Sequence, residues 1–155
     1  MVEGSGAAAA AGAWVAAARW TRTEEVIYPP ERDVSEEEPR IGVFVCHCGS
    51  NIGGFLDVPA VAEYAAGLPG VVHAEHNLYS CSQDAIQHIT EQTRNLGLNR
   101  VVVASCTPLT HEALFQDSIR QGGLNPGMFT MANIRNQCSW VHSGEWEAAT
   151  EKAEE

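Results

Sequence analysis

Short apolar runs alternate with segments of helical pattern, and this alternation restricts the chain to very few folds. The runs cover residues 41–45, 71–79, 100–104 and 129–132, and helices are expected over residues 58–67, 83–96 and 111–121. Strands that alternate with helices of this length form parallel sheets, because each helix returns the chain to the same end of the sheet. We therefore expect an α/β fold with a small parallel, Rossmann-like sheet of about four strands and flanking helices.

Local signals indicate where several of these elements begin and end. Asp57 precedes a Val-Pro pair that suits a first helical turn, and Ser82 is the expected N-cap of the next helix, which Gly97 would end. Residues 49–54 are expected to form a loop. Residues 145–155 are expected to start a charged helix that the end of the chain truncates.

The first 39 residues differ in composition from the rest, and we expect them to form a separate tail. They are rich in alanine and glycine and then acidic, with eight acids against three arginines. Such a composition buries too little apolar surface to order itself, so residues 1–39 are expected to be disordered. The alternative is a short helix over residues 7–20 that docks Trp14 and Trp20 on a partner. An α/β cysteine-cluster domain is then expected over residues 40–144.

Charge and cysteine content narrow the function classes. The net charge of −11 comes from the two ends, whereas residues 40–144 carry seven acids and five arginines. No basic stripe exists to neutralise phosphates, so nucleic acid is excluded as a partner. The alanine-rich stretch is too short to span a bilayer and lacks the basic region of a signal peptide. Because an odd number of cysteines does not fit a secreted disulfide framework, we expect a cytoplasmic protein.

Every apolar run is followed by cysteine. The five are Cys46 and Cys48 after the first run, then Cys81, Cys106 and Cys138 after the next three. Because the carboxyl ends of parallel strands share one edge of the sheet, all five thiols are expected to meet where open α/β sheets hold ligands. In extended backbone, Cys46 and Cys48 would point to the same side. The alternative is that these cysteines are ordinary small, buried hydrophobic residues.

Thiolates as the dominant donors favour zinc or an iron–sulfur cluster. The sequence lacks the paired knuckles of structural zinc and the cysteine run of ferredoxins. A nonlocal set of thiolates suits a [4Fe–4S] cluster, held by four of the five cysteines. Two alternatives stay open, namely a metal-free thiol–disulfide module and a docking domain with structural zinc.

Other residues near the cysteines have less specific interpretations. Arg135 would offset the negative charge of a thiolate-bound cluster, unless it is an ordinary surface arginine. His47 and His142 would act as ligands or proton acceptors, and a surface histidine is the alternative for each. The glycine-rich residues 49–54 lack both nucleotide-binding patterns, so we expect their backbone to pass close to the metal site.

With these residues identified, five stretches of the chain resemble the N-terminal domain of the iron–sulfur flavoprotein subunit of CoB–CoM heterodisulfide reductase. They cover residues 39–54, 77–84, 100–108, 110–112 and 131–142. The most specific is Met131-Ala-Asn-Ile-Arg-Asn-Gln-Cys-Ser-Trp-Val-His142. The resemblance extends from about residue 39 to 153, and all five cysteines match the family's pattern. Leu109 and Gly127 depart from it, since arginine and a bulkier residue are usual there.

The resemblance implies an electron-transfer module with a [4Fe–4S] cluster, in an oxidoreductase complex of the heterodisulfide reductase type. It would pass electrons between a flavin subunit and partner iron–sulfur subunits, with no membrane span. The family also implies FAD, but no dinucleotide fingerprint follows residue 142, so no FAD site is visible on this chain. We therefore expect either a truncated product or a stand-alone domain that meets its flavin subunit in trans.

Overall fold

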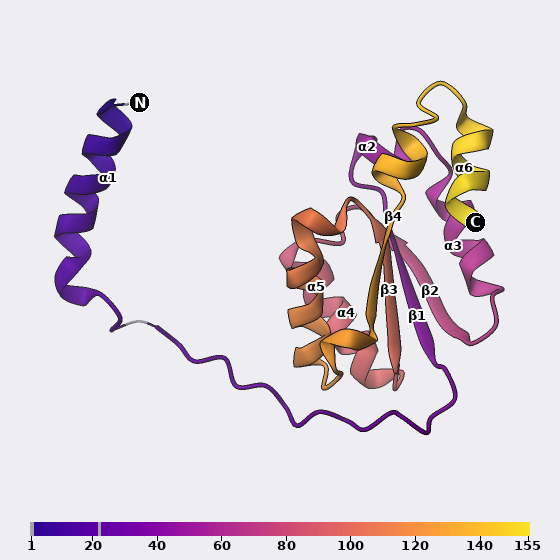
Figure 1. The fold of residues 1–155 in the computed structure, drawn as a ribbon, viewed down its shortest axis with the longest axis horizontal. Helices are drawn as coiled ribbons and strands as arrows, with labels where there is room; N and C mark the ends of the chain where they lie inside the picture. The colour runs from indigo at the N-terminus through magenta and orange to yellow at the C-terminus, as the bar shows by residue number, and fades with distance from the viewer. Residues whose placement is uncertain (1, 22) are drawn as a thin grey trace.

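The structure is a computed structural model that describes residues 2–21 and 23–155, and its centre is a parallel four-stranded sheet. The strands are β1 Ile41–Cys46, β2 Val71–Asn77, β3 Arg100–Ser105 and β4 Phe129–Asn133. They lie in the order β2-β1-β3-β4, and every neighbouring pair is parallel (Figure 1). The expected α/β fold with about four parallel strands is confirmed.

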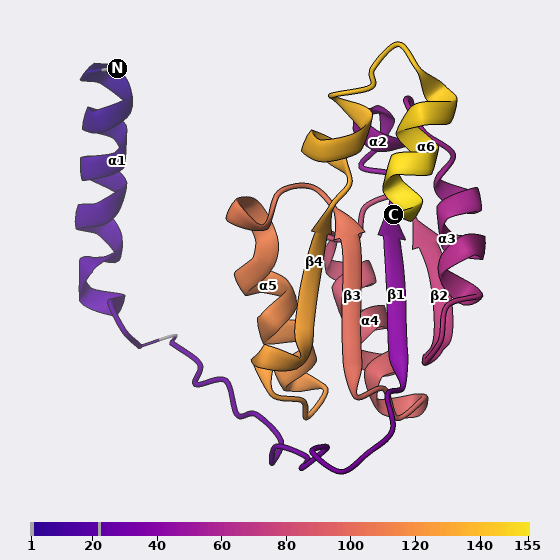
Figure 2. The ribbon, with the colours of Figure 1, turned by 45° about the vertical axis from the view of Figure 1, so that its right-hand side comes forward.

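Helices cover both faces of this sheet. The helices of the domain are α2 Ser50–Gly53, α3 Val58–Ala66, α4 Gln83–Asn95, α5 Pro108–Gln121 and α6 Trp146–Glu154, with a 3-10 turn at Pro126–Met128. Helix α3 packs beside α6 on one face, and α4 packs beside α5 on the other (Figure 2). The sheet is therefore the middle of three layers.

Two hydrophobic cores fill the space between these layers. Phe44 points from β1 into the core beneath α4 and α5, where Leu98 and Phe115 are also fully buried. Val43 and Val45 point the opposite way, into the core beneath α3 and α6. Strand β1 is thus buried on both faces, which explains its continuous apolar sequence. Each such side chain contributes roughly 1.5–3 kcal/mol to the free energy of unfolding.

Capping residues begin the helices where the sequence indicated. The Asp57 carboxylate accepts a hydrogen bond from the Ala60 N–H at 3.1 Å, and the Ser82 hydroxyl accepts one from the Ala85 N–H at 3.3 Å. Two expectations need correction. Residues 49–54 are not entirely a loop, because they include helix α2, and α5 begins three residues before the expected His111.

The strand order creates a switch point between β1 and β3. The chain leaves β1 towards β2 on one side, and it leaves β3 towards β4 on the other. Loops that diverge in this way open a crevice at the carboxyl ends of the two strands, where open α/β sheets bind ligands. Cys46, Cys48 and Cys106 lie in or directly after these two strands.

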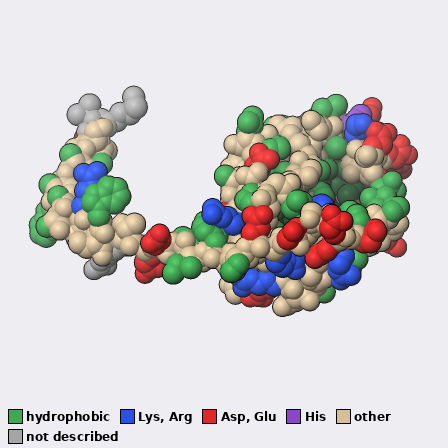
Figure 3. Space-filling model, turned by 60° about the horizontal axis from the view of Figure 1, so that its bottom comes forward, with side chains coloured by type: hydrophobic (Ala, Val, Ile, Leu, Met, Phe, Trp, Pro, Cys, Tyr) green, Lys and Arg blue, Asp and Glu red, His purple; other side chains and the backbone are tan. Residues whose placement is uncertain are grey.

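The N-terminal residues form a helix and then a strap. Helix α1, Val2–Val15, is followed by a 3-10 turn at Ala16–Ala18, and Figure 1 shows α1 away from the sheet. Residues 28–38, which we call the strap, cross the amino end of the sheet, where Val34 is only 3% exposed. Figure 3 views this end, where acidic and basic side chains are interspersed. The expected domain boundary at residue 40 stays a prediction. The strap nevertheless contacts the domain beyond that boundary, because Glu37 and Glu38 accept hydrogen bonds from Asn99.

Within the part of the chain that the structure describes, no helix is long and apolar enough to cross a membrane.

Candidate metal centre

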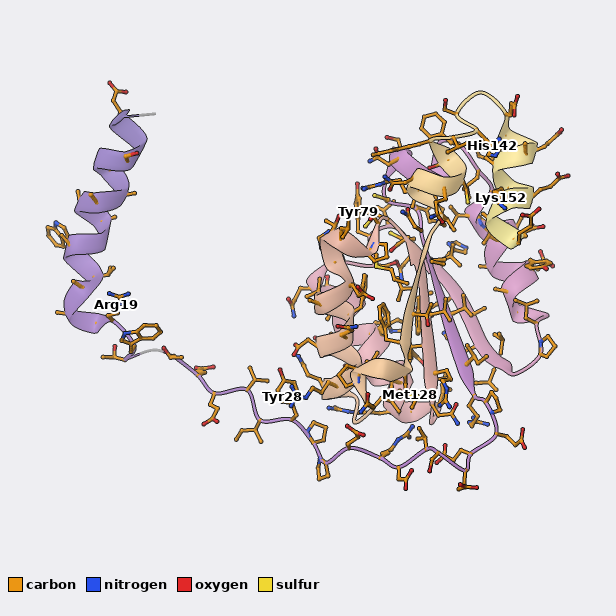
Figure 4. All side chains as sticks on the ribbon, viewed as in Figure 1. Arg19, Tyr28, Tyr79, Met128, His142 and Lys152 are labelled. Atoms are coloured by element: carbon orange, nitrogen blue, oxygen red, sulfur yellow. The ribbon has the colours of Figure 1, made fainter. Side chains whose placement is uncertain are left out.

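Four of the five cysteines line one cavity at the carboxyl edge of the sheet. Cys46 ends β1, Cys48 follows it, Cys81 precedes α4, and Cys106 follows β3. They share a cavity of about 60 Å³, which we call the cysteine cavity. Figure 4 shows Tyr79, another residue of its wall, at this edge of the sheet. Parallel topology therefore gathers thiols from three separate segments.

The sulfur of Cys46 lies among backbone hydrogen-bonding groups, and its thiol donates to the Leu78 carbonyl at 3.9 Å. It accepts from the backbone N–H of Cys48 at 3.2 Å and from that of Ser80 at 3.3 Å. Both Cys46 and Ser80 are buried. Backbone N–H groups are donors that would hydrogen-bond a cysteine sulfur ligated to a metal or a cluster.

The backbone turns sharply after β1, which corrects one expectation. Cys46 and Cys48 do not lie in a single extended segment, because the strand ends at Cys46 and Cys48 has a φ of +48°. A left-handed residue other than glycine costs on the order of 1–3 kcal/mol, and such residues concentrate at functional sites. Gly49 follows with a φ of +56°, and a Cβ there would lie 2.8 Å from the Tyr79 hydroxyl oxygen. The turn nevertheless leaves both cysteines in the lining of the cavity.

The thiols of the cavity influence each other electrostatically. Cys81 is exposed, but partial desolvation of its thiol is the main cause that raises its pKa, and negative charge on Cys46 and Cys106 raises it further. Burial also raises the pKa of Cys106, whereas the nearby Arg135 guanidinium lowers it. Like charges so close disfavour simultaneous ionisation. A bound cation would reverse that balance, since metal ligation requires thiolates.

A buried hydroxyl next to these thiols lacks a conventional partner. Among the described residues, the Ser105 hydroxyl is buried and makes no hydrogen bond of ordinary geometry, although it lies near enough to Cys106 to lower the pKa of that thiol. A buried polar group of this kind calls for a partner. A sulfur-rich group in the cavity would accept a hydrogen bond from this hydroxyl, so the residues present fit a thiolate-bound iron–sulfur cluster.

Cys138 lies outside the cysteine cavity. It is buried in the core beneath α3 and α6, and it lines a wider pocket of about 640 Å³ together with Met131 and Lys152. Burial raises the pKa of its thiol, and the Lys152 ammonium opposes this. The cause is a π-helical turn, Arg135–Ser139, that carries the chain from β4 to the face covered by α6. The structure thus brings four of the expected ligands together and separates the fifth.

The two histidines near the cysteines lie outside the cavity lining. The Nε2 atom of His47 lies 3.0 Å from the Nδ1 atom of His76. Burial is the main cause that lowers the pKa of His47, and the charge of His76 lowers it further. His142 lies 3.4 Å from the carboxylate of Glu145 at the surface. The structure instead adds Tyr79, Ser105 and His111 to the cavity wall. Their sequence signal was weak, because it was only their proximity to cysteines along the chain.

Within residues 2–21 and 23–155, no group of three or more His, Cys, Asp or Glu side chains is arranged to hold a metal ion. The identity of a group in the cysteine cavity is therefore a matter of proposal.

Sequence comparisons identify relatives of this chain, although no family model matches it. It is 50% identical over 125 residues to the A subunit of the H(2):CoB-CoM heterodisulfide,ferredoxin reductase of Methanothermobacter thermautotrophicus, covering 81% of this chain and 19% of that protein. It is 51% identical over 122 residues to an iron-sulfur A subunit of the CoB--CoM heterodisulfide reductase of Methanopyrus kandleri. This match covers 79% of this chain and 19% of that protein. A protein of Archaeoglobus profundus, named as similar to the A subunit of heterodisulfide reductase, is 48% identical over 122 residues. The match covers 79% of this chain and 17% of that protein. The chain thus spans about a fifth of the length of these curated relatives.

Proposed function

Because this chain is a homologue of one portion of the A subunit of heterodisulfide reductase, we propose that it is an electron-transfer module of a heterodisulfide-reductase-like complex. In this proposal a [4Fe–4S] cluster is held by Cys46, Cys48, Cys81 and Cys106. Cys138, the fifth expected ligand, is left out because it lines a different pocket.

One observation carries the proposal, namely the convergence of four thiols from three strand ends on one cavity. Soft thiolate donors select iron–sulfur clusters or zinc. The Methanopyrus kandleri relative is named an iron-sulfur subunit, which favours the cluster. Zinc is the rival that the experiment below separates from it.

The chain's own residues would perform three tasks at this centre. The cysteines would bind the cluster, the Cys48 and Ser80 N–H groups would donate to the Cys46 sulfur, and the Ser105 hydroxyl would supply a further hydrogen bond. When bound, a [4Fe–4S] cluster supplies one-electron transfer, taking one electron from a donor and passing the same electron to an acceptor. Burial of Cys46 and Cys106 would limit the access of water to the centre.

The partners in this proposal are flavin-containing and iron–sulfur subunits of the same complex, with FAD carried outside residues 1–155. Large apolar side chains are exposed in the chain segments that supply the cavity lining, with Leu109 97%, Val141 68% and Leu78 59% exposed. Such exposure beside a redox centre favours contact with another protein surface. A cytoplasmic location is part of the proposal, because reducing surroundings keep the thiols free.

Anaerobic reconstitution of the full chain with iron and sulfide tests the proposal. We expect about four iron atoms and four sulfides per chain, and a broad visible absorption that reduction bleaches. One equivalent of zinc without colour would favour the docking domain instead. A metal-free protein in which two cavity cysteines form a reversible disulfide would favour the thiol–disulfide module.

A further inference from the structure

A rare backbone turn brings an arginine and a tryptophan together beside the cysteine cavity. In the π-helical turn Arg135–Ser139, the N–H of Trp140 donates to the carbonyl of Arg135 at 2.9 Å. This spacing of five residues places both side chains on the same side of the turn. The Arg135 guanidinium lies over the Trp140 ring, 4.7 Å from its centroid. Turns of this type occur frequently at functional sites.

The turn is fixed to the segment that carries two of the cysteines. The buried hydroxyl of Ser139 donates to the carbonyl of Asn51 at 2.9 Å, and Asn51 lies three residues after Cys48. At the start of the turn, the Asn136 N–H donates to the Asn133 side chain at 3.0 Å. Hydrogen bonds between side chains and backbone groups therefore hold the turn that carries Arg135 on both sides.

Arg135 brings an uncompensated positive charge to the cavity. It is the one permanently cationic side chain among the described residues of the lining. Its side-chain hydrogen bond goes to the neutral amide of Asn136 at 3.3 Å, and no described carboxylate forms a salt bridge with it. An arginine used only for structure often pairs with a carboxylate. Arg135 instead lines the cavity, and its charge acts on the Cys106 thiol.

We propose that Arg135 is the charge-compensating residue of the cysteine cavity and that Trp140 is its positioning residue. The inference rests on the proposed function, since the charge acts on a thiolate-bound cluster. Reduction adds negative charge to such a cluster, so a fixed cation nearby favours the reduced form and raises the reduction potential. The planar guanidinium stacks on the indole ring, which is 49% exposed, and this contact holds the charge near the sulfurs.

The test measures the reduction potential of the reconstituted full chain by a redox titration that follows visible absorption and electron paramagnetic resonance. Arg135→Gln should shift the potential to more negative values at full iron content. Arg135→Lys, which keeps the charge, should restore most of the shift. Trp140→Leu should give an intermediate value, and Trp140→Phe should stay close to the wild type because a ring remains.

Arg94→Gln is the matched control, because it removes the same charge from an exposed position near the end of α4. It should leave the potential unchanged. A fully loaded Arg135→Gln protein with the wild-type potential would overturn this inference alone, as would an equal shift in Arg94→Gln. Failure of the wild-type chain to take up iron would overturn the proposed function and this inference together. If Arg135→Gln does not fold, the reduction potentials of Arg135→Lys and Trp140→Leu are compared with that of the wild type. Equal potentials in the wild type and Trp140→Leu would reject the positioning role of Trp140.

Discussion

The two ends of the sheet are built in opposite ways. At the amino end, the strap lies across the strands, and the buried Asn99 side chain uses its oxygen and both of its N–H groups in hydrogen bonds. At the carboxyl end, the backbone enters the left-handed region at Cys48, and the buried Ser105 hydroxyl lacks an ordinary partner among the described residues. The strap also holds one buried donor that lacks a partner among the described residues, the Arg32 Nε–H, but the unpaired Ser105 hydroxyl lies in the wall of the cysteine cavity.

This difference separates stability from chemistry within one small domain. Parallel sheets place ligands at the carboxyl ends of their strands, so strain and unpaired groups there are compatible with a binding role. Paired polar groups at the amino end stabilise the fold without approaching the cavity. Substitutions at the two ends should therefore have different consequences, and the following predictions test that separation.

The largest effect is expected from removing a cavity thiol. Cys46→Ser should abolish or greatly reduce iron binding after reconstitution, because a serine hydroxyl is a poor replacement for the soft sulfur ligand that iron–sulfur clusters require. Cys138→Ser is the matched control, since Cys138 is equally buried at the same end of the sheet but lines the other pocket. Iron and acid-labile sulfide content measure both variants. Equal loss of iron in the two would show that Cys138 reaches the cofactor.

At the amino end, Asn99→Ala should lower stability and leave iron binding intact. The substitution leaves the Arg40 N–H without its acceptor, which lies 2.7 Å away, and removes both bonds to the acidic segment before β1. Losing the partner of a buried donor costs about 1–3 kcal/mol. Urea denaturation measures this loss, with the exposed Gln87→Ala as a control. Normal stability in Asn99→Ala would mean that the strap does not close this end.

Local signals in the sequence were sufficient for most of the fold. The β-branched run at residues 41–45 became β1, and Asp57 and Ser82 cap their helices. These features depend on neighbours along the chain. The strap was not predicted, because its contacts, such as that between Tyr28 and Asp117, join residues 89 positions apart. Composition alone gives no sign of such a partner.

The candidate site was predictable only to the level of the sheet edge. Parallel topology correctly indicated that cysteines after different strands would approach each other. It could not indicate the face on which each lies, because that depends on the turn after the strand. The π-helical turn after β4 takes Cys138 to the α6 face and leaves Arg135 at the cavity. Its geometry depends on the contact between Ser139 and Asn51, which no sequence period reveals.

A smaller effect is expected from the turn that presents Cys48. Gly49→Ala should destabilise the chain by about 1–2 kcal/mol, because its φ of +56° suits glycine and a Cβ would crowd the Tyr79 hydroxyl. Gly144→Ala is the control, since nothing lies within 4 Å of a Cβ there. Urea denaturation gives the stability of each variant. An unchanged stability for Gly49→Ala would show that the turn carries no such constraint.

The smallest effect concerns the dependence of stability on pH at the amino end. The Tyr28 hydroxyl donates to the Asp117 carboxylate, and this hydrogen bond is the main cause that raises the pKa of Tyr28. A group with a raised pKa in the folded state stabilises the fold below its unfolded pKa, about pH 10 for tyrosine, and loses that contribution as the pH rises through the folded value. Tyr28→Phe should therefore be less stable than the wild type at pH 8, and the difference should shrink at high pH. Urea midpoints of both proteins between about pH 8 and pH 11 measure this difference. A gap that stayed constant across that range would show that the hydroxyl does not link the strap to α5.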